Sequence, residues 1–149
     1  MFFAGDPTDN MSYENIFDQS YERVKDRVVD GKAFFESFYD NFLASSPAVK
    51  ENFAATDMER QVKMMEKSFY GLFIFYATQN ANDFLETVAH RHSHADLNID
   101  HRLYDLWLDA LIGTVKTYDP QFNDDIALSW RIILSPGIAY MKHRHSSKF

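Results

Sequence analysis

Residues 83–99 read Asp83-Phe84-Leu85-Glu86-Thr87-Val88-Ala89-His90-Arg91-His92-Ser93-His94-Ala95-Asp96-Leu97-Asn98-Ile99. The stretch follows Asn82, a residue type that caps helices, and its apolar side chains recur at steps of three and four. Leu85, Val88 and His92 therefore share one face of a predicted helix, and an imidazole stands where the pattern asks for an aliphatic side chain. One of three closely spaced histidines is predicted to face the interior.

This inward histidine has three interpretations. His92 can be a core residue that makes a hydrogen bond to the backbone, as lone buried histidines commonly do. Alternatively, His90 and His94 form a surface metal site, because ligands at positions i and i+4 share a face, although no cysteine and no carboxylate at the usual spacing joins them. In the third interpretation, His92 is the axial ligand of a buried haem. These residues alone leave the three open.

The composition is that of a single acidic, aromatic-rich domain. With 149 residues, the chain is long enough to bury a large core or a cofactor. Aromatic residues make up 16%, more large apolar surface than self-packing of a helical domain needs, and a flat apolar guest would account for the excess. The net charge of −7 without a basic stripe argues against a nucleic-acid partner. The absence of cysteine excludes disulfides, thiolate catalysis and zinc–cysteine sites.

No stretch predicts a membrane segment or a secretion signal. The longest apolar run, residues 72–77, is too short to span a bilayer. The apolar start at residues 1–4 is short and lacks the basic residues of a signal peptide. We expect a cytoplasmic protein without a membrane partner.

The periodic segments predict an all-α protein with about six main helices. Only 5 glycines and 4 prolines interrupt the chain, and no strand-like alternation appears. Residues 1–11 are predicted to form an irregular arm, and residues 12–149 a single helical domain. The predicted helix starts follow Ser12, Gly31, Thr56 or Asp57, Asn82, Asp100 and Asn123, with a short helical turn at Pro47.

Three stretches resemble the globin family, most closely the single-domain bacterial globins of the Vitreoscilla type and the globin domain of flavohaemoglobins. Residues 37–53, SFYDNFLASSPAVKENF, are similar to the bacterial pattern F-Y-x-N…P-x-V…F. Residues 88–92, VAHRH, resemble the I-A-x-x-H that leads to the family's axial histidine. Residues 124–130, DDIALSW, open the last helix as they do in those proteins. The resemblance spans roughly residues 12–145.

The resemblance implies a globin fold whose helices sandwich a non-covalently held haem b. It implies that His92 is the proximal iron ligand and that Tyr39 and Gln61 stabilise a gas ligand on the distal side. Counting residues back along the corner would select His94 instead. We prefer His92, because the helix face supports it and loops tolerate insertions. The other haem-pocket residues expected from the resemblance are Phe53, Met65, Val88, Leu97, Ile99 and Tyr104.

Such a site is expected to bind O₂ reversibly at a five-coordinate iron, with nitric oxide and CO as further ligands. Nitric oxide dioxygenation is an enzymatic activity that it could support. A separate reductase would then be needed, because the chain has no Gly-rich nucleotide loop. Two other functions stay open: a haem-based sensor of O₂ or nitric oxide that acts through a partner protein, and a haem-free globin-like interaction module. The expected assembly is a monomer or a homodimer.

Overall fold

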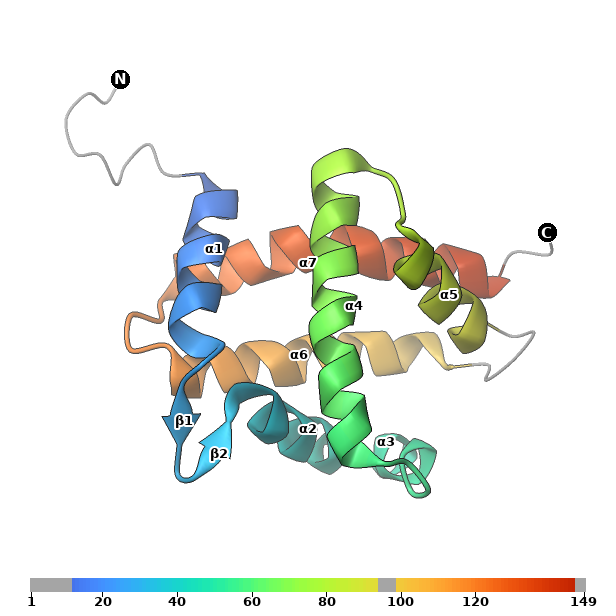
Figure 1. Ribbon diagram of the computed structural model, residues 1–149, viewed down its shortest axis with the longest axis horizontal. Helices are drawn as coiled ribbons and strands as arrows, with labels where there is room; N and C mark the ends of the chain where they lie inside the picture. Colours follow the sequence, from blue (N-terminus) through green and yellow to red (C-terminus); the bar gives the residue numbers. More distant parts are fainter. Residues whose placement is uncertain (1–11, 94–98, 147–149) are drawn as a thin grey trace.

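Seven helices and one short hairpin make up the part of the chain that the computed structural model describes, residues 12–93 and 99–146 (Figure 1). The helices are α1 (Tyr13–Val24), α2 (Phe34–Ser45), α3 (Pro47–Asn52), α4 (Met58–Thr78), α5 (Asp83–His92), α6 (His101–Tyr118) and α7 (Asp124–Ser146). The all-α prediction is confirmed, and the six main helices are joined by the short α3 that Pro47 begins. The predicted arm, residues 1–11, lies outside the described residues.

Five of the predicted helix starts are confirmed by capping bonds. The Ser12 hydroxyl accepts a hydrogen bond of 3.1 Å from the amide of Asn15, and the Asn82 side chain accepts one of 2.8 Å from the amide of Leu85. Each bond satisfies an amide that the helix itself leaves without a partner. The starts of α4, α6 and α7 are capped in the same way by Asp57, Asp100 and Asn123.

The hairpin between α1 and α2 was not predicted. Its strands, β1 (Val28–Val29) and β2 (Lys32–Ala33), have two residues each, too few to show an alternating pattern. The turn was predicted, and Asp30 and Gly31 form it with φ angles of 52° and 79°, a geometry that suits a tight hairpin. The hydroxyl of Tyr118 donates a 2.6 Å hydrogen bond to the Lys32 carbonyl and ties the hairpin to the end of α6.

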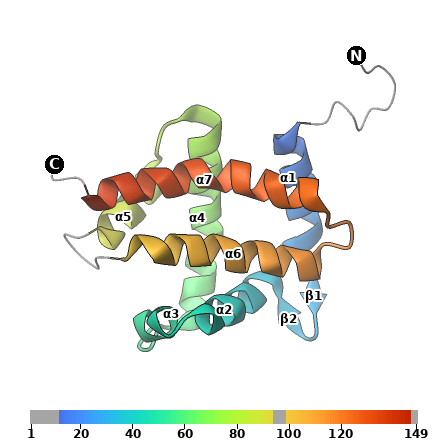
Figure 2. The same ribbon diagram turned by 180° about the vertical axis from the view of Figure 1, so that it is seen from behind.

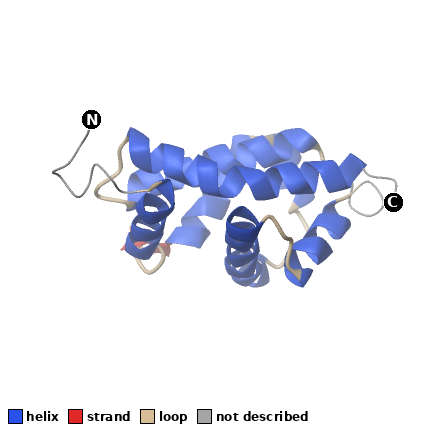
Figure 3. Ribbon diagram, turned by 90° about the horizontal axis from the view of Figure 1, so that it is seen from above, coloured by secondary structure: helices blue, strands red, loops and turns tan. Residues whose placement is uncertain are grey.

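The helices form two layers. Helices α6 and α7 run side by side in opposite directions, and α4 crosses them, with α1 and α5 on either side of α4 (Figures 1 and 2). Viewed along the layers, α6 and α7 lie on one side and the ends of the crossing helices on the other (Figure 3). Helix α2 packs against α6, and α3 follows α2 and packs against it (Figure 2). Among the helices of the described chain, none combines the length and the apolar character that a membrane span requires.

Two glycines permit close packing around the middle of α4. A Cβ added at Gly137 on α7 would overlap the Leu72 side chain of α4. A Cβ added at Gly71 would lie 3.1 Å from the Asn82 side-chain oxygen and 3.3 Å from the Leu85 Cβ at the start of α5. Neighbouring residues of α4 therefore set its distance from two other helices.

A buried polar network holds α1 against the end of α6 and the beginning of α7. Asp119 accepts bonds of 2.7 and 2.8 Å from the Arg23 guanidinium and one of 2.7 Å from the Ser20 hydroxyl. The Trp130 indole donates to Ser20 over 2.9 Å. Burial alone would raise the pKa of the Asp119 carboxyl, but the hydrogen bonds from Arg23, Ser20 and the Gln121 amide, with the Arg23 charge, outweigh burial and lower it.

We expect Gly137→Ala to destabilise the fold by about 1–3 kcal/mol, the usual cost of overpacking, because the added methyl must displace Leu72. Urea unfolding measures the change. Gly113→Ala on α6 is the matched control, because nothing lies within 4 Å of an added Cβ there. The control is expected to gain about 0.5–1 kcal/mol from the better helix propensity of alanine. Equal effects of the two substitutions would contradict the close approach.

Asp119 is expected to make stability sensitive to acid. Its pKa is lower in the folded than in the unfolded chain, so the stabilisation is complete above the unfolded pKa of about 4 and is lost as the pH falls further. Asp119→Asn should lower the free energy of unfolding near neutral pH by about 1.5–3 kcal/mol, the range for hydrogen bonds to charged groups. It should also flatten the decline of stability in acid. Urea titrations at a series of pH values measure both effects. If the stability of wild type and of Asp119→Asn falls in parallel as the pH is lowered, the Asp119 network is not the source of the acid sensitivity.

Candidate functional site

The two predicted ligand-stabilising residues, Tyr39 and Gln61, lie where α2 packs against α4. The Tyr39 side chain is buried, with 4% of its surface exposed, and the half-buried side chain of Gln61 lies near its hydroxyl. Burial raises the pKa of Tyr39 to about 12, against a smaller lowering by Gln61. The Tyr39 phenol therefore stays protonated at physiological pH, and its O–H can donate a hydrogen bond.

An aromatic and thioether lining surrounds this pair. The half-buried Phe53 ring lies 5.9 Å from the rings of both Tyr39 and Phe42, edge to face in each case. Met65 is buried on α4, one turn beyond Gln61. These contacts place the predicted residues Tyr39, Phe53, Gln61 and Met65 in one region of the molecule, next to α3.

His92 ends α5 and contacts residues on the far side of the following corner. Its ring is half-buried, and its Nδ1 lies 3.4 Å from the hydroxyl of Tyr104 on α6. Its carbonyl accepts a 3.0 Å hydrogen bond from the amide of Ile99. Burial raises the pKa of Tyr104 to about 12, so this hydroxyl also keeps its proton. Both the ring and the backbone of His92 are thus held by residues that lead into α6.

The neighbours of His92 follow the predicted helix face. Leu85 and Ala89 are buried and Val88 is half-buried, whereas His90 is exposed. His94 and Leu97 lie outside the described residues, so the second choice of ligand stays a prediction, as does the surface metal site. The described residues contain no group of three or more histidine, aspartate or glutamate side chains that could hold a metal ion.

The chemistry of these side chains fits a haem. A five-coordinate haem iron needs one imidazole nitrogen on one face and a polar donor near the open face. An Nδ1–H that donates to the Tyr104 oxygen would assign metal binding to Nε2 and fix the tautomer of His92, as the outer hydrogen bond of a ligating histidine usually does. Tyr39 and Gln61 supply the polar donors, and the other predicted pocket residues within the described chain are apolar or aromatic. Tyr104 was predicted as a pocket residue, but its contact with the imidazole was not.

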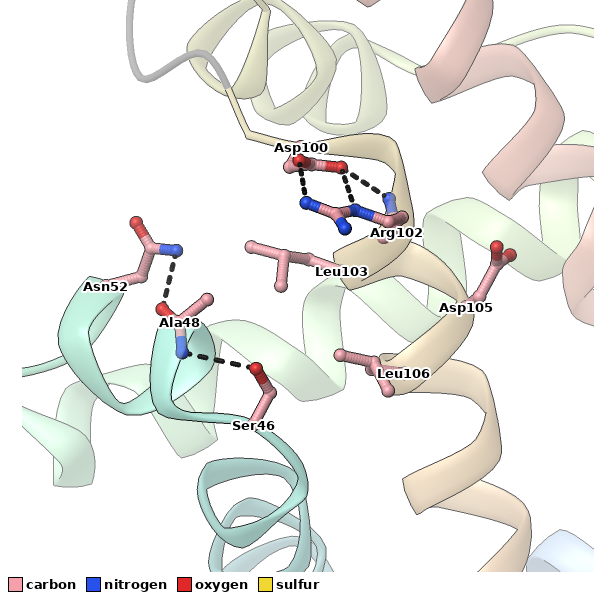
Figure 4. A pocket seen from close by; sticks show the side chains of 8 residues that line it. All are labelled: Ser46, Ala48, Asn52, Asp100, Arg102, Leu103, Asp105 and Leu106. Carbon is pink, nitrogen blue, oxygen red and sulfur yellow. Dashed lines mark hydrogen bonds and ion pairs between the residues drawn. The ribbon is translucent and has the colours of Figure 1, made fainter.

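A surface cavity of about 480 Å³ lies between α3 and the start of α6 and contains none of the predicted ligand-stabilising residues (Figure 4). Asp100 and Arg102 face Asn52 across it, with Leu103 between them (Figure 4). The Arg102 guanidinium pairs with Asp100 over 3.1 Å, and the Asn52 amide donates to the Ala48 carbonyl over 3.0 Å.

One solved structure shares this architecture. It is a protein of Pseudomonas aeruginosa PAO1 described as structurally highly homologous to a human haemoglobin. The two chains are 34% identical and superpose with a TM-score of 0.81, over 91% of this chain and 100% of the other. No family model matches the sequence, and no curated protein matches it.

The crossing helices define a haemoglobin-like all-α protein. The chain belongs to the globin family. The family resemblance seen in the sequence is confirmed, and a haemoglobin-like fold suggests a haem cofactor.

Tyr104→Phe should change the hydrogen bonding of the His92 ring without affecting histidines elsewhere. The substitution keeps the buried ring and removes the hydroxyl 3.4 Å from Nδ1. In ¹⁵N NMR spectra of the full chain, the Nδ1 resonance of His92 is expected to shift because its bonding partner is lost. The exposed His143 provides the internal control and should keep its resonances. An unchanged His92 resonance would show that the hydroxyl does not bond to the imidazole in solution.

Proposed function

We propose that this globin holds haem b through His92 and binds O₂ reversibly. The observation that carries the proposal is the buried Tyr39 phenol with the Gln61 side chain near it, because these are the two groups that the family resemblance assigns to the distal side. Because its pKa is about 12, the phenol keeps its proton and its O–H can donate to a small ligand. The haemoglobin-like fold supports the same function.

The residues of the chain would have separate roles toward the haem and its gas ligand. When bound, haem supplies a ferrous iron with an open position for diatomic gases. His92 would hold the group from the end of α5, and the Tyr104 hydroxyl would orient its ring. Tyr39 would donate to a gas ligand that gains negative charge, with Gln61 holding the phenol in place. Phe53 and Met65 would exclude water, which would otherwise compete for the phenol.

The visible absorption spectrum tests the proposal directly. We expect the purified protein, or the protein after addition of haem, to show a ferrous spectrum that changes reversibly with O₂. Acid–acetone should extract the pigment, because the chain has no cysteine to form a thioether link. A protein that takes up no haem would contradict the proposal and favour the haem-free interaction module.

His92→Gly should weaken haem retention and leave an iron position that added imidazole fills. The ring is removed while the helix end remains, so external imidazole is expected to restore a five-coordinate ferrous spectrum. His90→Gly is the matched control, since His90 is two residues away on the same helix and exposed. His94→Gly tests the second choice. Loss of haem from that variant, with retention in His92→Gly, would transfer the proximal role to His94.

Tyr39→Phe should shorten the residence of O₂. A hydrogen bond to a charged group contributes about 1.5–3 kcal/mol, so its loss should speed O₂ release by roughly tenfold to a hundredfold. Flash photolysis or stopped-flow mixing measures the rate. Because the pKa of Tyr39 is about 12, the wild-type rate should also stay constant from neutral to moderately alkaline pH. An unchanged rate in Tyr39→Phe would mean that the phenol does not donate to the ligand.

A further inference from the structure

A shallow groove of about 400 Å³ lies between the outer side of α4 and the start of α5, in the layer that crosses α6 and α7 (Figure 1). Its lining residues are Glu66, Lys67 and Tyr70 of α4 and Asn82 and Phe84 of α5. Tyr70 is 63% exposed and Phe84 is half-buried, so two aromatic rings of the groove contact water. Exposed aromatic side chains beside a hollow are typical of surfaces that bind another protein.

The outer face of α4 is basic. The helical repeat places five side chains of α4 on one face, opposite the buried face that carries Met65, Phe69 and Leu72. The five are Arg60, Lys63, Lys67, Tyr70 and Ile74. All of them are exposed except Ile74, which is half-buried. Three positive charges therefore lie within about two turns of α4 and point away from the core.

The start of α5, on the other side of the groove, is acidic. Asp83 and Glu86 are exposed in its first turn. Within residues 12–93 and 99–146, neither carboxylate forms an ion pair, and neither do the three basic side chains of α4. The groove thus separates positive charges on one helix from negative charges on the next, and both sets are available to a partner.

This arrangement of charge favours an identical partner over a uniformly charged one. An acidic partner on α4 would be repelled by the start of α5, and a basic partner on α5 would be repelled by α4. A second copy, turned about a twofold axis, brings its own α5 to α4 and its own α4 to α5, so the attraction occurs twice. The exposed Tyr70 of each copy then lies against the groove of the other and covers Phe84.

We propose that the chain forms a twofold-symmetric dimer through the outer face of α4 and the start of α5, with the basic side chains of each α4 paired with Asp83 and Glu86 of the other copy. The net charge of −7 opposes association at long range, so the local pairing of opposite charges selects this contact. The dimer goes beyond the proposed function and does not depend on haem, because its surface contains none of the haem-site residues.

Sedimentation equilibrium of the purified full chain measures the dimer, whose mass is twice the 17.4 kDa of one chain. One double variant, Lys63→Glu with Lys67→Glu, reverses the charge of α4. A second, Asp83→Lys with Glu86→Lys, reverses the charge of α5. Each double variant should raise the dimer dissociation constant at least about tenfold, since the twofold axis repeats every lost ion pair and replaces it with a repulsion.

An equimolar mixture of the two double variants gives the sharpest test. Each variant alone sets like charges against each other, whereas a dimer with one copy of each sets opposite charges against each other at both contacts. The mixture should therefore recover a dissociation constant within about threefold of wild type, the usual error of adding separate effects. Recovery would also show that both variants are folded.

Two further comparisons separate the groove from general effects of charge and exposure. Lys50→Glu with Lys116→Glu makes the same change of net charge at two exposed lysines on α3 and α6, and should leave the dimer unchanged. Tyr70→Ala should weaken the dimer, because the groove of the partner loses the ring that fills it. Tyr13→Ala at the start of α1, 38% exposed, is its control.

A wild-type chain that stays monomeric at about 1 mM would overturn the dimer and leave the groove to a different protein. A dimer that both double variants retain would also overturn the proposal, because the contact would then lie elsewhere on the surface. Failure of the mixture to associate, with both variants folded by circular dichroism, would exclude the pairing of α4 with α5.

Discussion

The middle of α4 is fixed by two contacts that leave no space for an additional carbon atom. Leu72 occupies the position where a Cβ on Gly137 of α7 would lie, and Gly71 touches the capping residue Asn82 and Leu85 of α5. Close-packed interiors do not deform smoothly, so these contacts set both the depth of α4 and the origin of α5. The rest of the two-layered arrangement is built around this crossing.

The positions of both halves of the candidate site depend on this crossing at the middle of α4. Toward its beginning, α4 brings Gln61 close to Tyr39 on α2. Toward its end, the contact at Gly71 starts α5 at a fixed place, and that helix is just long enough to bring His92 to Tyr104. The phenol–amide pair and the imidazole therefore share one rigid support, although they stand on three different helices.

Most of the fold could be predicted because its signals are local. Capping side chains and three-four spacing involve residues within a turn of each other, and the face that carries His92 inward was correct in outline. The hairpin strands were too short to leave a pattern. The bond from Tyr104 to the imidazole spans a corner, and Asp119 recruits Ser20 from the opposite end of the chain, so no local spacing indicates either contact. The roles of Tyr39, Gln61 and His92 toward haem stay predictions.

The hydrogen bond from the Ile99 amide to the His92 carbonyl closes the corner between α5 and α6 into a loop with joined ends. The entropy of closing such a loop grows only slowly with its length, so residues gained or lost inside it cost little. The ends stay where the bond holds them, and the imidazole keeps its orientation. Related chains can therefore diverge in the length of this corner while the same histidine keeps its place. An alignment that counts residues back across the corner would then miss His92 by the length of the insertion.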